Sequence, residues 1–249
     1  MNSYVGTKRR ALLVASISFL AGIIITIFAD EVKNINITIL MQYILFQSIS
    51  EPRPEMFLAI ISCLIPFLIL VFPLTNIISN DLQICSVYMF TRYNNREIWY
   101  FKKNISLFLY TFLSCFLYFV TIIAALTLRG AHFDFQTYSF LLQFANIFLF
   151  LFTMSLFVNI MSIILPTHLS FLLLVGGLGL QVSLALIVKI NANSFYYINS
   201  INNYFYIWRD DTPSILNLII QFVISLIIFI IGLVIIKSID ISTIDKDYT

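Results

Sequence analysis

Long apolar blocks alternate with short polar or aromatic segments along most of the chain. A helix that crosses a bilayer needs about 20 predominantly apolar residues. Blocks of that length occur at about 11–29, 56–78, 104–128, 140–165, 169–190 and 214–236. They predict an all-α membrane protein with six transmembrane helices in a single transmembrane domain over residues 1–249. Only Pro166, Thr167 and His168 separate the fourth block from the fifth, which predicts a tight antiparallel hairpin.

The composition supports lipid as the solvent for these blocks. Hydrophobic residues make up 60% of the chain and charged residues 10%, with a mean hydropathy of +0.96, whereas soluble domains contain about 25% charged residues. The net charge of +2 is small, and Lys8–Arg10 is the one basic run. We therefore expect no nucleic-acid partner.

The orientation follows from the Lys and Arg residues, because basic residues near span ends are retained in the cytoplasm. With the N-terminus inside, most of the 14 Lys and Arg residues are cytoplasmic, namely Lys8, Arg9, Arg10, Arg92, Arg96, Lys102, Lys103, Lys237 and Lys246. Lys33, Arg53, Arg129, Lys189 and Arg209 then lie outside. Six spans therefore place both termini in the cytoplasm.

Sequence signatures of catalysis are missing. There is no GxxxxGK[ST] phosphate loop, no HExxH and no GxSxG, and His132 and His168 fall in loops on opposite sides. We expect no catalytic residue, metal site or cofactor in this chain, so ATP and Mg²⁺ would be bound by a separate subunit. The spans lack paired acids and histidines, which disfavours a membrane-embedded enzyme, and their lack of ionisable groups disfavours an ion-coupled carrier.

Uncharged polar residues do occur within the spans, at Gln143, Asn146, Asn159, Gln181 and Gln221. Two interpretations stay open. These residues form hydrogen bonds between helices, worth about 1 kcal/mol each, or they line a weakly polar translocation surface.

Glycine and proline add two structural expectations. Gly176, Gly177 and Gly179 lie mid-span and predict close helix packing. Pro66 and Pro73 lie two turns apart in the second span and predict a helix kink there.

The segment 79–103, between the second and third spans, is the most distinctive loop. Its first half is apolar enough to lie on the bilayer as a helix, and Thr91 to Asn95 then interrupt it. Asn95 can cap a new helix whose first turn carries Glu97, a favourable position against the helix dipole. The segment predicts a helix-turn-helix at the membrane surface.

This loop resembles one in the membrane permeases of type 2 ABC exporters, including small Gram-positive permeases linked to the export of, or immunity to, antimicrobial peptides. In that family an acidic residue leads a short helix, followed by a polar turn with an arginine and then by a lysine that opens the third span. The matching residues here are Asp81, Thr91, Arg92, Asn94, Asn95, Arg96, Lys102 and Lys103. The proline and glycine usual in that turn are absent.

The resemblance implies a loop that couples the permease to a cytosolic ABC ATPase, and a second permease in a homodimer or heterodimer. The competing interpretation is an ordinary connector, since basic residues are expected on that side anyway. By the same resemblance, the outer segment 191–213 contains short re-entrant helices; an interfacial loop is the alternative.

The implied function is ATP-driven export of an amphipathic or hydrophobic substrate, such as a peptide or toxin. The alternatives are an immunity permease that clears antimicrobial peptides from the membrane and a non-transporting scaffold. The expected location is the cell membrane, as a multi-pass protein, and the Ile-, Phe- and Asn-rich composition is typical of Gram-positive bacteria of low GC content.

Overall fold

The computed structural model describes residues 2–27, 34–36, 65–80, 82, 96–130, 132–134, 137–190 and 215–238. The elements in chain order are α1 (Asn2–Ile27), β1 (Asn34–Asn36), the 3₁₀-helix η1 (Phe72–Leu74), α5 (Arg96–Leu128), β2 (His132–Asp134), α6 (Thr137–Ile164), α7 (Thr167–Ile190) and α9 (Ile215–Ser238). Within these residues, the predicted helical fold is confirmed apart from the two three-residue strands.

Three helices are long and apolar enough to cross a membrane, at Arg96–Leu128, Phe140–Ile164 and Leu218–Ser238. They agree with the predicted spans at 104–128, 140–165 and 214–236. Their outward side chains are apolar as well, and in α9 Phe222, Ile230 and Val234 are half exposed or more. Such a surface suits lipid, and the chain therefore has the helices of a membrane protein.

The other predicted spans are found in part. Helix α1 covers most of 11–29 but begins earlier, at Asn2, and α7 covers 169–190. Of 56–78 the structure describes only the portion from residue 65 onward. The predicted outer loop 191–213 lies outside the described residues.

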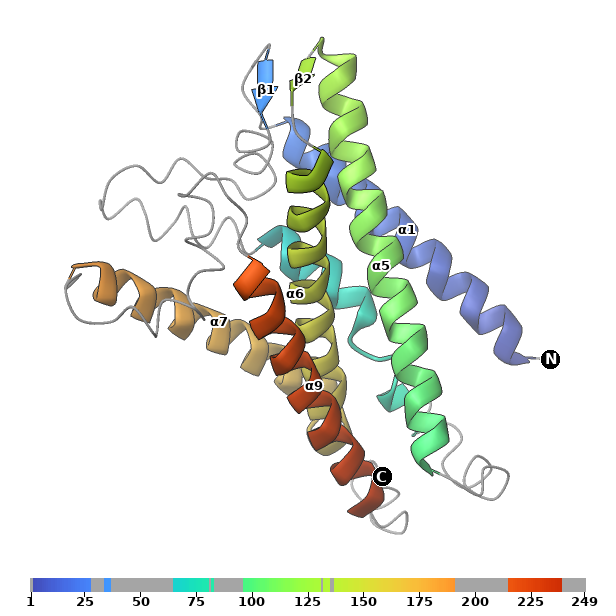
Figure 1. The fold of residues 1–249 in the computed structure, drawn as a ribbon. Helices are drawn as coiled ribbons and strands as arrows, with labels where there is room; N and C mark the ends of the chain where they lie inside the picture. Colours follow the sequence, from blue (N-terminus) through green and yellow to red (C-terminus); the bar gives the residue numbers. More distant parts are fainter. Residues whose placement is uncertain are drawn as a thin grey trace.

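Helix α6 is central, and it packs against α5, α7 and α9, while α1 packs along α5 on the far side (Figure 1). The main core is built from buried side chains of several helices. It contains Ala21, Phe67, Leu70, Val71, Cys115, Tyr118, Phe119, Ile122, Leu126, Ile147, Phe148, Leu151, Met154, Val158, Leu174 and Leu178. Aromatic rings fill the interface between α5 and α6, as in the edge-to-face pair Phe108–Phe148, whose centroids are 4.9 Å apart.

The two short strands join segments that are far apart in the sequence. β1 pairs with β2 in parallel, with Asn34 opposite His132 and Asn36 opposite Asp134. The pair lies beside the last turn of α5 and the first turn of α6 (Figure 1). It therefore holds the segment after α1 at the same end of the bundle as the connection between α5 and α6.

The helix around the two prolines is interrupted, as predicted at Pro73. Residues 65–71 are α-helical, Phe72–Leu74 form η1, 75–78 form a turn, and helix resumes at 79–80. Pro73 lies in the first turn of η1, where its missing N–H and fixed φ are tolerated. Pro66 lies in the first turn of the described helical stretch.

The connection between α6 and α7 is as short as predicted, at Leu165 and Pro166, and the Ser170 amide donates to the Pro166 carbonyl at 3.0 Å. The predicted tight hairpin is not formed, because α7 extends away from the bundle instead of running back along α6 (Figure 1). Side chains near the start of α7 pack on the interrupted helix. Phe171 packs edge to face on Phe72, with ring centroids 5.8 Å apart.

Candidate functional site

The residues at both ends of the predicted coupling loop lie at one end of the bundle, where α5, α9 and the segment 78–82 pack together. The Glu97 carboxylate on the first turn of α5 lies 2.8 Å from the Lys237 ammonium on the last turn of α9. Both side chains are about half exposed, at 53% and 52%. The ion pair thus marks the point at which the start of α5 meets the end of α9.

Buried apolar side chains lie beneath this ion pair, and we call them the end cluster: Ile78, Leu82, Trp99, Tyr100 and Ile236. The Tyr100 ring stacks on Phe229 with centroids 5.2 Å apart, and its hydroxyl donates to the Phe229 carbonyl at 3.2 Å. The end cluster therefore packs α5, α9 and the segment 78–82 together, and both ends of the predicted loop start from it.

The structure describes four of the predicted coupling residues, Arg96, Glu97, Lys102 and Lys103, all on the first turns of α5. Helix α5 begins at Arg96, which confirms the predicted helix start after Asn95 and the first-turn position of Glu97. Lys102 is exposed, whereas Arg96 and Lys103 are half-buried. The remaining predicted residues lie outside the described residues: Asp81, Thr91, Arg92, Asn94 and Asn95.

The Asn159 side chain on α6 forms hydrogen bonds with two backbone groups of the interrupted helix. In a continuous α-helix the Ile78 amide would donate to the Leu74 carbonyl. Here the Ile78 amide donates to Asn159 Oδ1 at 3.0 Å, and Asn159 Nδ2 donates to the Leu74 carbonyl at 2.6 Å. The fully buried Asn159 side chain therefore replaces one missing backbone hydrogen bond with two, and we call this arrangement the Asn159 bridge.

Hydroxyl groups form two further contacts between helices. Ser18 Oγ on α1 lies 2.8 Å from Ser114 Oγ on α5, and Thr111 Oγ1 on α5 lies 3.4 Å from Ser155 Oγ on α6. All four side chains are buried. The sequence interpretation did not single them out; the available signal was the presence of small hydroxyl residues within apolar spans.

Of the five predicted polar residues, the three on α6 do not share one face of that helix. Gln143 and Asn146 are one turn apart on α6, whereas Asn159 lies about 160° around the same helix from Gln143, at 100° per residue. Gln143, Asn146 and Gln221 are buried, and the side-chain oxygen of each has no hydrogen-bond partner within the described part of the chain. The side chain of Gln181 lies outside the described residues. Hydrogen bonding between helices, the other interpretation, is thus observed for Asn159.

Close helix packing occurs at glycines other than the predicted ones. A Cβ added at Gly176, Gly177 or Gly179 would meet no described atom within 4 Å, so the predicted close packing is not found there among the described residues. A Cβ at Gly22 would lie 2.7 Å from Thr121 Cβ, and one at Gly232 would lie against the Tyr100 hydroxyl and Ile160. Packing depends on which face of a helix meets a neighbour, and the sequence spacing of α7 does not show this.

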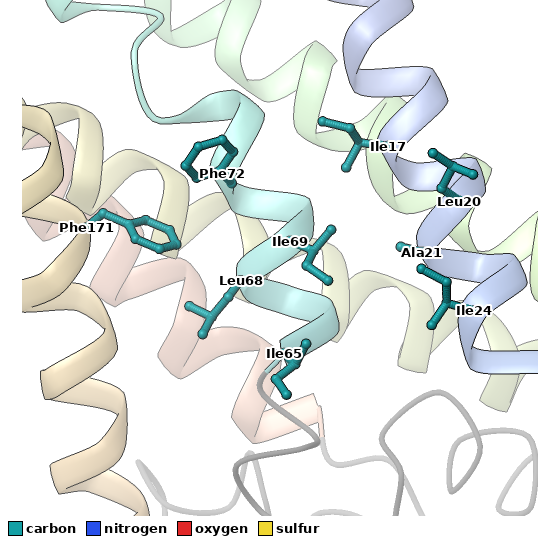
Figure 2. A pocket seen from close by; sticks show the side chains of 9 residues that line it. All are labelled: Ile17, Leu20, Ala21, Ile24, Ile65, Leu68, Ile69, Phe72 and Phe171. Carbon is teal, nitrogen blue, oxygen red and sulfur yellow. The ribbon is translucent and has the colours of Figure 1, made fainter. Parts of the chain in front are cut away.

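An apolar groove lies between α1 and the helical segment at 65–72, with a volume of about 470 Å³ (Figure 2). Its lining consists of Ile17, Leu20, Ala21, Ile24, Ile65, Leu68, Ile69, Phe72 and Phe171. Sequence interpretation missed it, since a groove depends on how neighbouring helices separate and not on residue type alone.

Within the described residues there is no group of three or more His, Cys, Asp or Glu side chains that could hold a metal ion. Cys115 is buried in the main core with a free thiol. Comparison of the chain with protein-family models, with curated proteins and with solved structures finds no match.

Proposed function

We propose that the chain is the permease subunit of an ATP-driven ABC exporter that moves an amphipathic or hydrophobic substrate, such as a peptide or toxin, out of the cell. ATP is hydrolysed by a separate cytosolic ABC ATPase, and a second permease completes the translocation path. In this proposal the loop 79–103 is cytoplasmic and docks on the ATPase.

The observation that carries the proposal is the end cluster with its Glu97–Lys237 ion pair. Leu82 near the start of the loop 79–103 and Trp99 and Tyr100 near its end share one cluster with Ile236 of α9, and Glu97 pairs with Lys237 of α9. A displacement of the loop therefore acts on α5, α9 and the interrupted helix together. A loop that only connected two spans would not need residues near both of its ends in the same buried cluster.

The Asn159 bridge extends this path into the bundle. It links Leu74 and Ile78, which precede the loop, to Asn159 near the C-terminal end of α6 through two hydrogen bonds. Motion of the loop is thereby transmitted to α6, which packs against α5, α7 and α9. The cargo class rests on the lack of charged residues in the described parts of the spans at 104–128 and 140–165, which suits an apolar or amphipathic molecule better than an ion.

The test is to co-express the full chain with candidate ABC ATPases, purify any complex in detergent and measure complex formation and stimulated ATP hydrolysis. Asp81→Asn, Arg92→Gln and Arg96→Gln are expected to lower both. Arg129→Gln, after the last turn of α5 at the other end of the bundle, is the matched control. Binding and turnover unchanged in all three loop variants would falsify the coupling role.

A transport assay separates exporter from immunity permease and scaffold. Vesicles containing the complex are given a fluorescent amphipathic peptide either in the lumen or in the membrane. An exporter clears peptide from the ATPase side, an immunity permease clears only membrane-inserted peptide, and a scaffold moves neither.

A further inference from the structure

The groove between α1 and the segment 65–72 is apolar in every lining side chain and faces outward. Four of its aliphatic side chains, Leu20, Ile24, Ile65 and Ile69, are between 37% and 56% exposed, and Phe72 is 63% exposed. Figure 2 shows the α1 side chains facing Ile65 and Ile69 across the open space. In a bilayer such a groove is filled by hydrocarbon or by another apolar helix.

Basic residues precede the groove on the same face of α1. Arg10 comes seven residues before Ile17, and Ile24 follows after seven more. Seven residues are close to two helical turns, so these three residues lie on one stripe, with about 10 Å of rise between neighbours. Arg9 is exposed beside this stripe.

The basic residues of α5 lie at the same end. Ser18 contacts Ser114, and Gly22 lies against Thr121, so α1 and α5 run in the same direction. Lys102 and Lys103 on the first turns of α5 therefore lie at the same end of the helix pair as Arg9 and Arg10. Anionic headgroups are attracted to such a basic end.

We propose that the groove is a binding site for an anionic phospholipid, with one acyl chain between α1 and residues 65–72 and with the phosphate on Arg9 and Arg10. The dimensions fit. Half of a bilayer core is about 15 Å thick and each headgroup layer adds about 5–7 Å, which matches the rise of about 21 Å from Arg10 to Ile24. An acyl chain whose phosphate is at Arg10 therefore passes Ile17 and ends near Ile24. A guanidinium has five N–H donors, which allows Arg10 to bind a phosphate in addition to its contacts within the chain.

Charge favours a lipid over a second copy of this chain in the groove. A two-fold interface brings the same patch of both copies together. Two copies meeting along this face of α1 would oppose Arg9 and Arg10 to the same residues of the partner. An anionic lipid neutralises these charges. The proposal does not depend on the transport function, because it concerns only the groove and its basic end.

The test uses the full chain in vesicles of equal phosphatidylcholine and phosphatidylglycerol. After mild solubilisation and size-exclusion chromatography, the lipids retained per protein are counted by mass spectrometry. We expect phosphatidylglycerol to be retained in preference. Arg9→Gln/Arg10→Gln is expected to lower the ratio of retained phosphatidylglycerol to phosphatidylcholine at least about fivefold, the loss that one basic residue near anionic headgroups accounts for.

A second variant fills the groove. Leu20→Phe/Ile69→Phe changes two partly exposed side chains, and it is expected to lower the retention of both lipids while the circular dichroism stays unchanged. Arg129→Gln is the control and should retain lipid like the unchanged chain. Equal retention of the two lipids by the unchanged chain overturns the proposal, as does a preference that survives loss of both arginines. If Leu20→Phe/Ile69→Phe abolishes dimers but retains lipid, the groove binds a second copy of the chain, and the lipid proposal is overturned.

Discussion

Asn159 Nδ2 donates a hydrogen bond of 2.6 Å to the Leu74 carbonyl, across 85 residues of sequence. The same amide also donates to the Ser155 carbonyl of its own helix at 2.8 Å. One side chain thus secures an interrupted helix to its neighbour at a buried position, where solvent does not reach the freed backbone groups.

Replacement of Asn159 by Leu is expected to lower the free energy of unfolding by about 2 kcal/mol, because the Leu74 carbonyl and the Ile78 amide lose their partner while they stay buried. The measurement is unfolding in mixed micelles followed by circular dichroism. Gln143→Leu on the same helix is the control, with an expected change under about 0.5 kcal/mol. Equal losses in the two variants would contradict the role of the bridge.

Gln221→Leu is expected to raise the free energy of unfolding by about 1 kcal/mol. Both polar atoms of the Gln221 side chain are buried and have no hydrogen-bond partner within the described residues, and removal of unsatisfied polar atoms relieves a desolvation cost. If Gln221 serves the translocation surface, the stabler variant also has lower substrate-stimulated ATP hydrolysis. A clear loss of stability would mean that the amide is bonded in the assembled protein.

Gly232→Ala is expected to cost about 1–3 kcal/mol of stability, since the added methyl group meets the Tyr100 hydroxyl and Ile160 in a packed interface. Gly176→Ala is the matched control on α7, where a Cβ has open space. The control should be neutral or should stabilise by up to about 1 kcal/mol through helix propensity. Similar behaviour of the two alanine variants would argue against close contact between α5 and α9 at Gly232.

Charge reversal at Glu97 or at Lys237 is expected to cost no more than about 1 kcal/mol, because both side chains are half exposed. The double reversal, Glu97→Lys/Lys237→Glu, should restore the attraction between the two side chains but not their favourable positions against the helix dipoles. A double-mutant cycle of unfolding at low and high salt measures the coupling, which should shrink at high salt. A coupling energy of zero at low salt would mean that the ion pair does not help to connect the loop with α5 and α9.

Features that depend on local sequence were predictable. The lengths of the apolar blocks predicted three candidate spans. The polar turn followed by Glu97 predicted the start of α5. Pro73 predicted the interruption in the second span. Each of these signals acts within a few residues of the structure that it determines.

Features that depend on distant partners were not predictable. An Asn in an apolar block has the same sequence pattern whether it faces lipid, a substrate or the backbone of a helix 81 residues away. The pairing of β1 with β2 and the direction of α7 likewise depend on which surfaces meet after the helices have formed. The groove exists only because α1 and the segment at 65–72 separate, which no single segment encodes.

The interruption at Phe72–Ile78 looks like a natural hinge, yet its hydrogen bonding implies the opposite. Its freed backbone groups stay satisfied only while Asn159 remains beside them, so the segment at 65–80 and α6 have to move as one rigid body. An interruption that elsewhere would let a helix bend therefore stiffens this one against α6.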